Sequence, residues 1–385
     1  MNARYCRVAR ALGLVVALGS VSGGCSKGGG DSDLLTVGAF FSLSGVDAVR
    51  GNDSREGVEL ATDEINAAGG IKGTKVRLLM EDDKSSLQET SSKVIQLIDR
   101  DKAVAILGEV AAARSTAAGL VADSKHIPMI SPSSTSAEVN QGREYVFRAC
   151  VTDDAQGKGG ADFAVNRLGK RRIAILSAAE DIASSGLSSS FRESATERGA
   201  TIVADAAYPK GEKDFTTYLR EIKRADPEII YAPVSSGDMV VIARQAKIMG
   251  IAGSSFMGGD GWDSDDLLEG AAGELEGAFL TNHYAPDVPW PTTQAFVKSY
   301  ARHFHHDPTR VAAQGYDAAR LLFDAMERAK DFAPDLIKDA IAATKGFRGA
   351  TGTIDIDSHR NAQKPVVVEQ IKNGKFTYSS TVSGG

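Results

Sequence analysis

Short apolar segments alternate with amphipathic segments along almost the whole chain, and this alternation limits the fold more than any other feature. Runs such as 34–41 and 75–81 are rich in β-branched and aromatic side chains, which is typical of buried strands. Between them, Val58, Ala61 and Ile65 lie at helical spacing. A helix between two strands provides the long crossover connection that a parallel pair needs, so these strands are expected to pair in parallel. The sequence therefore predicts an α/β fold with parallel sheets covered by helices on both faces.

The alternation occurs in two successive series, which predicts two sheets. The first series extends over 34–131 and the second over 155–258. After a further strand at 277–282, the chain continues with expected helices at 292–306, 311–328 and 333–344 and expected strands at 352–356 and 365–372, the last leading into a hairpin turn at 373–374. A chain of 385 residues also exceeds a comfortable single core, so two lobes are expected.

Residues 1–24 have the features of an export signal. Three arginines precede an apolar run at 11–21 that is too short to span a bilayer. The small residues before Cys25 resemble the processing site of bacterial lipoproteins, in which the cysteine is lipidated and becomes the first residue. Ser22 differs from the leucine that is usual in this motif. An ordinary cleaved signal with a chance cysteine is the alternative interpretation.

The segment 25–33 is rich in glycine and serine and is expected to be a flexible tether between the lipidated cysteine and the lobes. Cys150 is the one cysteine beyond the tether, so it has no internal disulfide partner and is expected to be a small core residue. The net charge of −6 is not offset by a basic stripe, which argues against a nucleic-acid partner. No later apolar run reaches membrane-spanning length.

Three loops that follow expected strands carry candidate ligand-binding residues, because ligands of open α/β sheets bind beyond the carboxyl ends of the strands. The loops 108–113 and 131–136 lead toward helices, whose first N–H groups attract an anion such as a carboxylate. The serines of the second loop have helix capping as an alternative role. In the third loop, glycines flank Asp260, which either accepts hydrogen bonds from a ligand ammonium or bonds its own turn. Trp262 is either a wall of the pocket or a core residue.

A set of short motifs occurs in a fixed order from about Leu34 to about Tyr378. The motifs are SG at 44–45, GVELA at 57–61, EINAAGGIKG at 64–73, PMISP at 128–132, KDF at 213–215, MGGDG at 257–261 and GYD at 315–317. Together they resemble the leucine/isoleucine/valine-binding family of type I periplasmic binding proteins. The resemblance implies two Rossmann-like lobes with parallel-sheet cores, which are joined by a three-strand hinge and close around the ligand. The lobes would comprise 34–152 with 281–357, and 153–280 with 358–385.

The same resemblance implies which residues bind the ligand. The family holds the ligand carboxylate with backbone N–H groups and a hydroxyl of the first lobe, and Ala112, Ser133 and Thr135 match these positions. It holds the ligand ammonium partly with an acidic residue of the second lobe, which falls on Asp260. The binding chemistry expected from the resemblance is therefore that of a zwitterion gripped at both of its charged ends.

Other positions of the expected pocket wall depart from the family, and they bear on the identity of the ligand. Arg50 stands where an aromatic residue is frequent, and Arg114 lies in a loop that is usually built of small residues. Small residues lie near two positions where the family commonly has tyrosines, which would enlarge the pocket. An extra arginine would favour a ligand with a second acidic group. The expected wall comprises Arg50, Val110, Ala183, Ala232 and Trp262.

These features predict an extracytoplasmic substrate-binding lipoprotein of an ABC importer. It would be a monomer that binds an amino acid, branched-chain or related, in the periplasm and delivers it to an ABC permease in the inner membrane. One alternative is a ligand sensor of the same fold that feeds a signalling receptor, and another is a binding protein for a carboxylate that is not an amino acid.

No catalytic residue, metal or cofactor is expected. An exported enzyme is disfavoured because no nucleophile–base pair can be assigned to adjacent strand ends. The histidines His303, His305 and His306 do not share one helical face, and they are expected to be a solvated surface group rather than a metal site.

Overall fold

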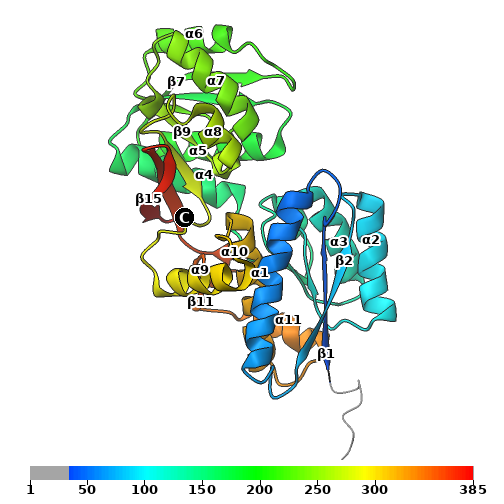
Figure 1. Cartoon of the computed structure of the whole chain (residues 1–385). Helices are drawn as coiled ribbons and strands as arrows, with labels where there is room; N and C mark the ends of the chain where they lie inside the picture. The colour runs from blue at the N-terminus through cyan, green and yellow to red at the C-terminus, as the bar shows by residue number, and fades with distance from the viewer. Residues whose placement is uncertain (1–33, 385) are drawn as a thin grey trace, which may run out of the picture. The chain divides into compact units, whose positions relative to one another are not determined.

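Two separate sheets organise residues 34–384, which are the residues that the computed structural model describes (Figure 1). The first sheet has five strands in the order β2-β1-β3-β4-β5, and all of its pairs are parallel. The strands are β1 (Leu35–Phe41), β2 (Val76–Asp82), β3 (Ile106–Leu107), β4 (Met129–Ser131) and β5 (Val146–Arg148). The expected export signal, the tether and Cys25 lie outside the described residues.

The second sheet has seven strands in the order β15-β14-β10-β9-β8-β6-β7. The strands β6 to β10 pair in parallel, whereas β14 is antiparallel to both β10 and β15. The prediction of parallel sheets is thus confirmed, with an antiparallel hairpin added at one edge. The strands are β6 (Arg172–Ala178), β7 (Thr201–Tyr208), β8 (Ile229–Tyr231), β9 (Phe256–Gly258), β10 (Phe279–Asn282), β14 (Val366–Lys372) and β15 (Lys375–Val382).

Helices flank both sheets, as the alternating pattern predicts. The first sheet and its helices are called the first lobe below, and the second sheet with its helices is called the second lobe. The helices of the first lobe are α1 (Ala48–Ala67), α2 (Leu87–Ile95), α3 (Ala112–Ser124), α9 (Pro291–Phe304), α10 (Arg310–Arg328) and α11 (Pro334–Ala342). Those of the second lobe are α4 (Asp153–Asp162), α5 (Ile182–Glu197), α6 (Thr216–Ala225), α7 (Ser236–Ile248) and α8 (Asp265–Ala271).

Shorter elements complete the two lobes. Two expected helices continue as π-helical turns, which the helical spacing does not predict: η2 (Gln96–Arg100) follows α2, and η4 (Phe163–Arg167) follows α4. The 3₁₀ turns are η3 (Ala137–Val139), η5 (Gly253–Ser255) and η6 (Asp260–Trp262). A small antiparallel sheet is formed by β11 (Phe347–Gly349), β12 (Gly352–Ile356) and β13 (Ala362–Gln363).

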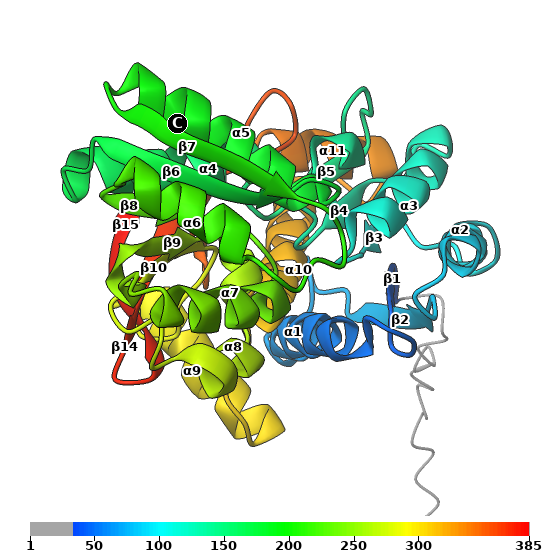
Figure 2. The same cartoon turned by 90° about the horizontal axis from the view of Figure 1, so that it is seen from above.

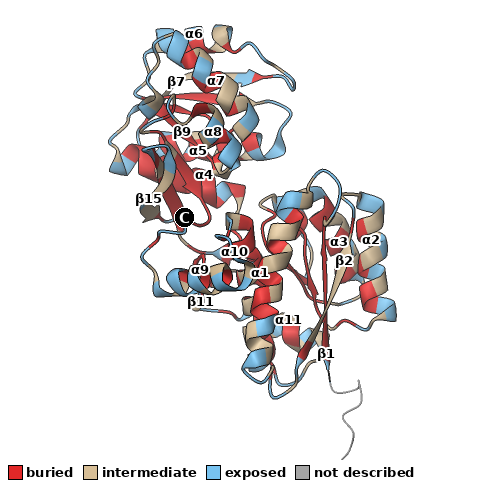
Figure 3. Ribbon diagram, in the orientation of Figure 1, coloured by how far each residue is buried: buried red, intermediate tan, exposed pale blue. Residues whose placement is uncertain are grey.

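Each large sheet has its own hydrophobic core (Figure 3). In the first lobe, Val37 and Leu107 of the sheet pack with Leu321 of α10. In the second lobe, Leu176 and Ile230 of the sheet pack with Trp262. Cys150 is a buried free cysteine, which confirms its expected place in the interior. No helix among the described residues is long and apolar enough to cross a membrane.

The helices α1 and α10 run parallel in very close contact, and this packing brings their amino-terminal ends together. Figure 2 shows the two helices side by side. A Cβ atom added to Gly57 would lie 2.0 Å from the carbonyl oxygen of Ala312, and one added to Gly315 would lie 2.4 Å from that of Ser54. Two glycines thus allow an approach that any side chain would prevent. At the amino-terminal ends, the hydroxyl of Thr309 donates to Asp53 at 2.9 Å.

Candidate functional site

Serine hydroxyls tie the first two candidate loops to each other. Ser131 and Ser134 of the second loop each donate to the carbonyl oxygen of Glu109 in the first loop, at 3.0 and 3.1 Å. Ser134 also lies 2.7 Å from the hydroxyl of Ser115 on α3. These hydroxyls are buried, so the bonds between them hold both loops at the carboxyl ends of β3 and β4. Neither serine caps an α-helix, so the capping alternative does not apply to this pair.

A network of buried charged side chains fixes the position of the first loop. The Glu109 carboxylate accepts from the hydroxyl of Ser42 at 2.9 Å and from the guanidinium of Arg114 at 3.3 Å. Arg114 also lies 2.6 Å from Asp47, the residue before α1, and 3.6 Å from Asp83. Burial, together with the charge of Asp83, raises the pKa of Glu109, and Arg114 opposes this shift. Arg114 therefore holds the loop in place, and carboxylates of the protein itself pair with its charge.

The start of α3 presents unpaired hydrogen-bond donors beside an unpaired hydroxyl. Ala111 precedes the helix and provides no side-chain cap, and none of the described residues accepts a bond from the N–H of Ala112 or Ala113. The hydroxyl of Ser133 is buried and has no partner among the described residues. Free N–H groups at a helix start and a spare hydroxyl are the donors that a carboxylate needs.

Thr135 connects the second loop to the second lobe. Its carbonyl oxygen accepts from the guanidinium of Arg148 at 2.7 Å and from the N–H of Asp153, the first residue of α4, at 3.4 Å. Its hydroxyl favours the ionised form of the Asp153 carboxylate and opposes the rise of that group's pKa. One oxygen of the carboxylate is buried and has no partner among the described residues. Burial, with the charge of Asp260, raises the pKa of Asp153 to about 7.

Asp260 lies on η6 directly after β9, and it is already engaged with two cationic or polar side chains. Its carboxylate is 3.2 Å from a guanidinium nitrogen of Arg310, the first residue of α10, and 3.4 Å from Nε2 of His283. Burial alone would raise the pKa of Asp260, but Arg310 and His283 outweigh it and hold this pKa below its usual range. Burial lowers the pKa of His283, which makes it a neutral donor. Asp260 is therefore a carboxylate that the protein itself partly neutralises.

Arg310 also donates through Nε to Asp263, at 3.1 Å, so it joins the first lobe to two carboxylates of the second. Burial would lower the pKa of Arg310, but the charges of Asp260 and Asp263 raise it. The guanidinium therefore remains charged at every physiological pH.

Arg50 lies in the first turn of α1, and its side chain is exposed. None of the described carboxylates lies within ion-pair distance of it. Burial of its surroundings and the charge of Arg310 lower its pKa, whereas Asp47, Asp260 and Glu109 raise it. Arg50 lies about one turn after Asp47, whose carboxylate is 2.6 Å from Arg114, so the start of α1 lies beside the first loop.

The residues of the expected pocket wall lie in different environments. Trp262 is completely buried in the core of the second lobe, and its Nε1–H donates to the carbonyl oxygen of Ala232 at 3.0 Å. The core interpretation of Trp262 is therefore the correct one. Ala232 and Val110 are also buried, in the hydrophobic cores of the second and the first lobe respectively. Ala183 is exposed.

Several residues of this site escaped the sequence prediction. Arg310, Asp153 and His283 lie in no recognisable motif of their own, and they meet their neighbours in the site only through the fold. One local signal was available for Arg310: an arginine at the first position of a helix is unfavourable next to the positive helix end unless it has an acidic partner.

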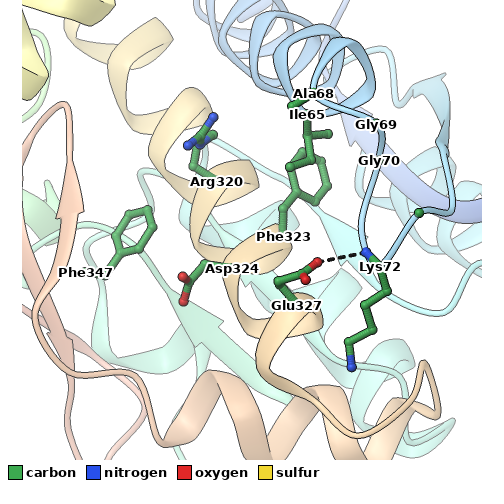
Figure 4. Close-up of a pocket in the computed structure, with 11 residues that line it drawn as sticks. Ile65, Ala68, Gly69, Gly70, Lys72, Arg320, Phe323, Asp324, Glu327 and Phe347 are labelled. Carbon is green, nitrogen blue, oxygen red and sulfur yellow. Dashed lines mark hydrogen bonds between the residues drawn. The ribbon is translucent and has the colours of Figure 1, made fainter.

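Two other regions do not belong to this site. A hollow between the end of α1 and α10 is lined by Ile65, Lys72, Phe323 and Glu327, among others, and Lys72 donates its N–H to Glu327 at 2.8 Å (Figure 4). No expected ligand-binding residue lines it. The exposed histidines His303 and His306 approach different carboxylates of α1, and no group able to hold a metal occurs among residues 34–384.

Polar loops gathered at the carboxyl ends of strands from two parallel sheets are the arrangement of an α/β protein that binds a small molecule. The chain belongs to the periplasmic binding protein family, whose model matches residues 35–375. Its fold is that of the type I periplasmic binding proteins. The members found by comparison are binding proteins and not enzymes.

Individual relatives cover most of the chain. An amino acid binding protein of Pseudomonas aeruginosa is 30% identical over 271 residues, which are 70% of this chain and 71% of that protein. A Leu/Ile/Val-binding protein homologue of Brucella abortus is 27% identical over 324 residues, or 80% of each chain.

Among solved structures, the leucine-binding protein LivK of Thermotoga maritima has a TM-score of 0.78 and 32% identity, and covers 91% of this chain and 99% of its own. The substrate-binding protein LivJ of Streptococcus pneumoniae, in complex with isoleucine, has a TM-score of 0.78, 30% identity and the same coverage. The predicted family and fold are thereby confirmed.

Proposed function

We propose that the chain is the extracytoplasmic substrate-binding lipoprotein of an ABC importer. In this proposal an amino acid, branched-chain or related, binds between the two lobes, which close by hinge motion and then dock on an inner-membrane ABC permease. Cys25 carries the lipid anchor. The lobe bounds in this proposal are close to those expected from the sequence. They differ because all of β10 (Phe279–Asn282) pairs within the second sheet and β13 pairs with β12, so the connecting segments that would form the hinge lie near residues 149–152, 283–290 and 364–365.

The observation that carries the proposal is the set of free donors at the start of α3. The N–H groups of Ala112 and Ala113 and the buried hydroxyl of Ser133 lack acceptors among the described residues. A buried donor without a partner costs about 1–3 kcal/mol. A ligand carboxylate supplies the missing acceptor, and the positive end of the helix favours its charge.

Relatives support an amino acid as the source of that carboxylate. The similar proteins include an amino acid binding protein, a Leu/Ile/Val-binding homologue and a structure in complex with isoleucine. Asp260 and the unpaired oxygen of Asp153 are the acceptors available for a ligand ammonium on the opposite side.

One observation favours a second candidate, a carboxylate ligand without an ammonium. Asp260 is already paired with Arg310 and His283, so it does not require a cation from the ligand. A ligand whose single charge is a carboxylate would satisfy the α3 donors and leave this pair intact.

Binding measurements separate the two candidates. Purified protein is tested by thermal shift against all proteinogenic amino acids and against carboxylates of similar size without an amino group. We expect amino acids to raise the melting temperature, because a ligand that binds only the folded state stabilises it. A rise with the carboxylates alone would support the second candidate, and no rise with either class would contradict the proposal.

The role of Asp260 is tested by Asp260→Ala with Asp266→Ala as the control, since Asp266 is an exposed aspartate of the same segment. We expect amino-acid affinity measured by calorimetry to fall at least tenfold in the first variant, which corresponds to about 1.4 kcal/mol for a charge-assisted contact. Unchanged affinity would remove Asp260 from the site.

A further inference from the structure

We propose that the bound amino acid has an acidic side chain, and that Arg50 pairs with its second carboxylate. This inference rests on the proposed function, because it assumes that an amino acid occupies the space between the loops of the two lobes. It names the class of substrate that the site selects.

The first step is that Arg50 has no ion-pair partner among residues 34–384. It lies in the first turn of α1 with an exposed side chain, and none of the described carboxylates lies within ion-pair distance of it. By contrast, Arg55 on the same helix approaches the carboxylate of Glu59 at 3.4 Å. An arginine that the protein leaves unpaired at a binding site is available to a ligand anion, which its planar fork binds in a bidentate manner.

The second step is that each of the carboxylates nearest to Arg50 is already paired with another arginine. Asp47 lies 2.6 Å from Arg114, and Glu109 lies 3.3 Å from the same guanidinium. Asp260 lies 3.2 Å from Arg310. Arg50 therefore adds a positive charge to a site whose nearest negative charges already have partners.

The third step is that the backbone adds positive potential at the same place. The helices α1 and α10 run parallel, so their amino-terminal ends lie together, and neither helix has an acidic residue in its first turn. Each helix start carries roughly half a positive charge, and each here carries an arginine as well. Of these two arginines, Arg310 is paired with Asp260 and Asp263, so Arg50 is the one whose charge is available to an anion.

The fourth step is that this anion differs from the α-carboxylate of the ligand. The α-carboxylate matches the free donors of α3 and Ser133, which belong to other elements of the first lobe. Arg114 and Asp47 link the start of α3 to the residue before α1, so the two anion-binding places are neighbours. One ligand with two carboxylates, such as L-aspartate or L-glutamate, is able to occupy both.

The experiment compares each acidic amino acid with its uncharged amide. Calorimetry is carried out on the unaltered protein with L-glutamate, L-glutamine, L-aspartate, L-asparagine, L-leucine and the dicarboxylate glutarate. We expect one acidic amino acid to bind at least tenfold more tightly than its amide. We also expect this preference to shrink as sodium chloride is raised, because salt screens the ion pair.

Variants assign the preference to Arg50. Arg50→Gln is expected to reduce the preference for the acid over its amide to less than threefold, and Arg50→Lys to retain part of it. The control Arg55→Gln removes an arginine that faces Glu59 on the same helix, and it is expected to leave the preference unchanged. Melting temperatures without ligand verify that each variant is folded.

The outcomes separate the inference from the function on which it rests. Equal binding of acid and amide, or tightest binding of leucine, overturns the inference and leaves the proposed function intact. An equal loss of affinity for the acid and for its amide in Arg50→Gln also overturns the inference, because Arg50 would then act on lobe closure and not on the second carboxylate. If glutarate binds and no amino acid does, the proposed function is contradicted. If glutarate binding is then lost in Arg50→Gln, that result still supports pairing of Arg50 with an anion.

Discussion

Asp153 differs from the other carboxylates near the candidate site because no cation lies within ion-pair distance of it among the described residues. The groups that face it are the hydroxyl of Thr135, the carboxylates of Asp260 and Asp181, and the more distant guanidinium of Arg148. Burial and the neighbouring negative charges therefore favour its protonated form. A group of this kind links stability to pH in the range in which binding proteins operate.

Asp153→Asn is expected to make folding stability less dependent on pH. The pKa of Asp153 rises from 3.8 to about 7 on folding, so the folded chain retains a proton that the unfolded chain releases. The resulting stability is fully present below pH 3.8 and is lost as the pH rises through about 7. The free energy of unfolding of the variant minus that of the unaltered protein should therefore be about 2–3 kcal/mol larger at pH 8 than at pH 5.

Denaturant unfolding at the two pH values measures this difference. The matched control is Asp154→Asn, since Asp154 is the exposed neighbour on the same helix and pairs with Lys158. Equal pH dependence of the Asp153 variant and the unaltered protein would show that Asp153 is ionised in the folded state.

At the scale of single residues, the sequence predicted positions better than partners. It placed Ala112, Ser133 and Asp260 just beyond the carboxyl ends of strands, and the structure has them there, Ala112 as the first residue of α3 and Asp260 on η6. It did not identify the Arg310–Asp260 pair, because the two residues are 50 positions apart and meet only through the packing of two lobes. For Trp262, a glycine-rich turn fits both a wall and a core residue, and only the packing decides between them.

At the scale of elements, the contact between α1 and α10 positions both arginines of the site. Gly57 lies in the middle of α1, where a methyl group would collide with the carbonyl oxygen of Ala312 at 2.0 Å. Gly237 also lies in a helix, α7, but a methyl group there would meet no atom within 4 Å. Alanine substitutions at these two glycines therefore distinguish the effect of close packing from the effect of helix propensity.

Gly57→Ala is expected to lower the free energy of unfolding by about 1–3 kcal/mol, because overpacking outweighs the better helix propensity of alanine. Gly237→Ala should change it little or increase it by up to about 1 kcal/mol. Chemical denaturation of both variants measures the effect. A neutral Gly57→Ala would mean that the helices separate at little cost.

Most elements were predictable because their spacing patterns are local. The strands and helices of both series follow the expected order, and Asn373 and Gly374 adopt the positive φ angles of the expected hairpin turn. The π-helical turns were not predictable, because the residues of η2 fit an ordinary continuation of α2. The pairing of β14 with β10 also depends on contacts far apart in the sequence.

At the scale of the whole molecule, the lipid anchor is tested through the cysteines. Cys25→Ala is expected to yield protein that no longer partitions into a detergent phase, because the residue that would carry the lipid is absent. Cys150→Ala is the control, since Cys150 is buried in the interior and has no role in anchoring. Partitioning that persists in the first variant would place the anchor elsewhere.

The seven-stranded sheet has a consequence for how the chain folds. Strand β10 lies between β9 and β14, and β14 in turn pairs with β15. The core of the first lobe likewise includes Leu321 and Ile341, which are synthesised late. Each lobe therefore takes part of its sheet or core from segments that follow the second series of strands and helices. A fragment limited to one of the two series would leave apolar surface of its sheet uncovered, so the two halves of the chain depend on each other for folding.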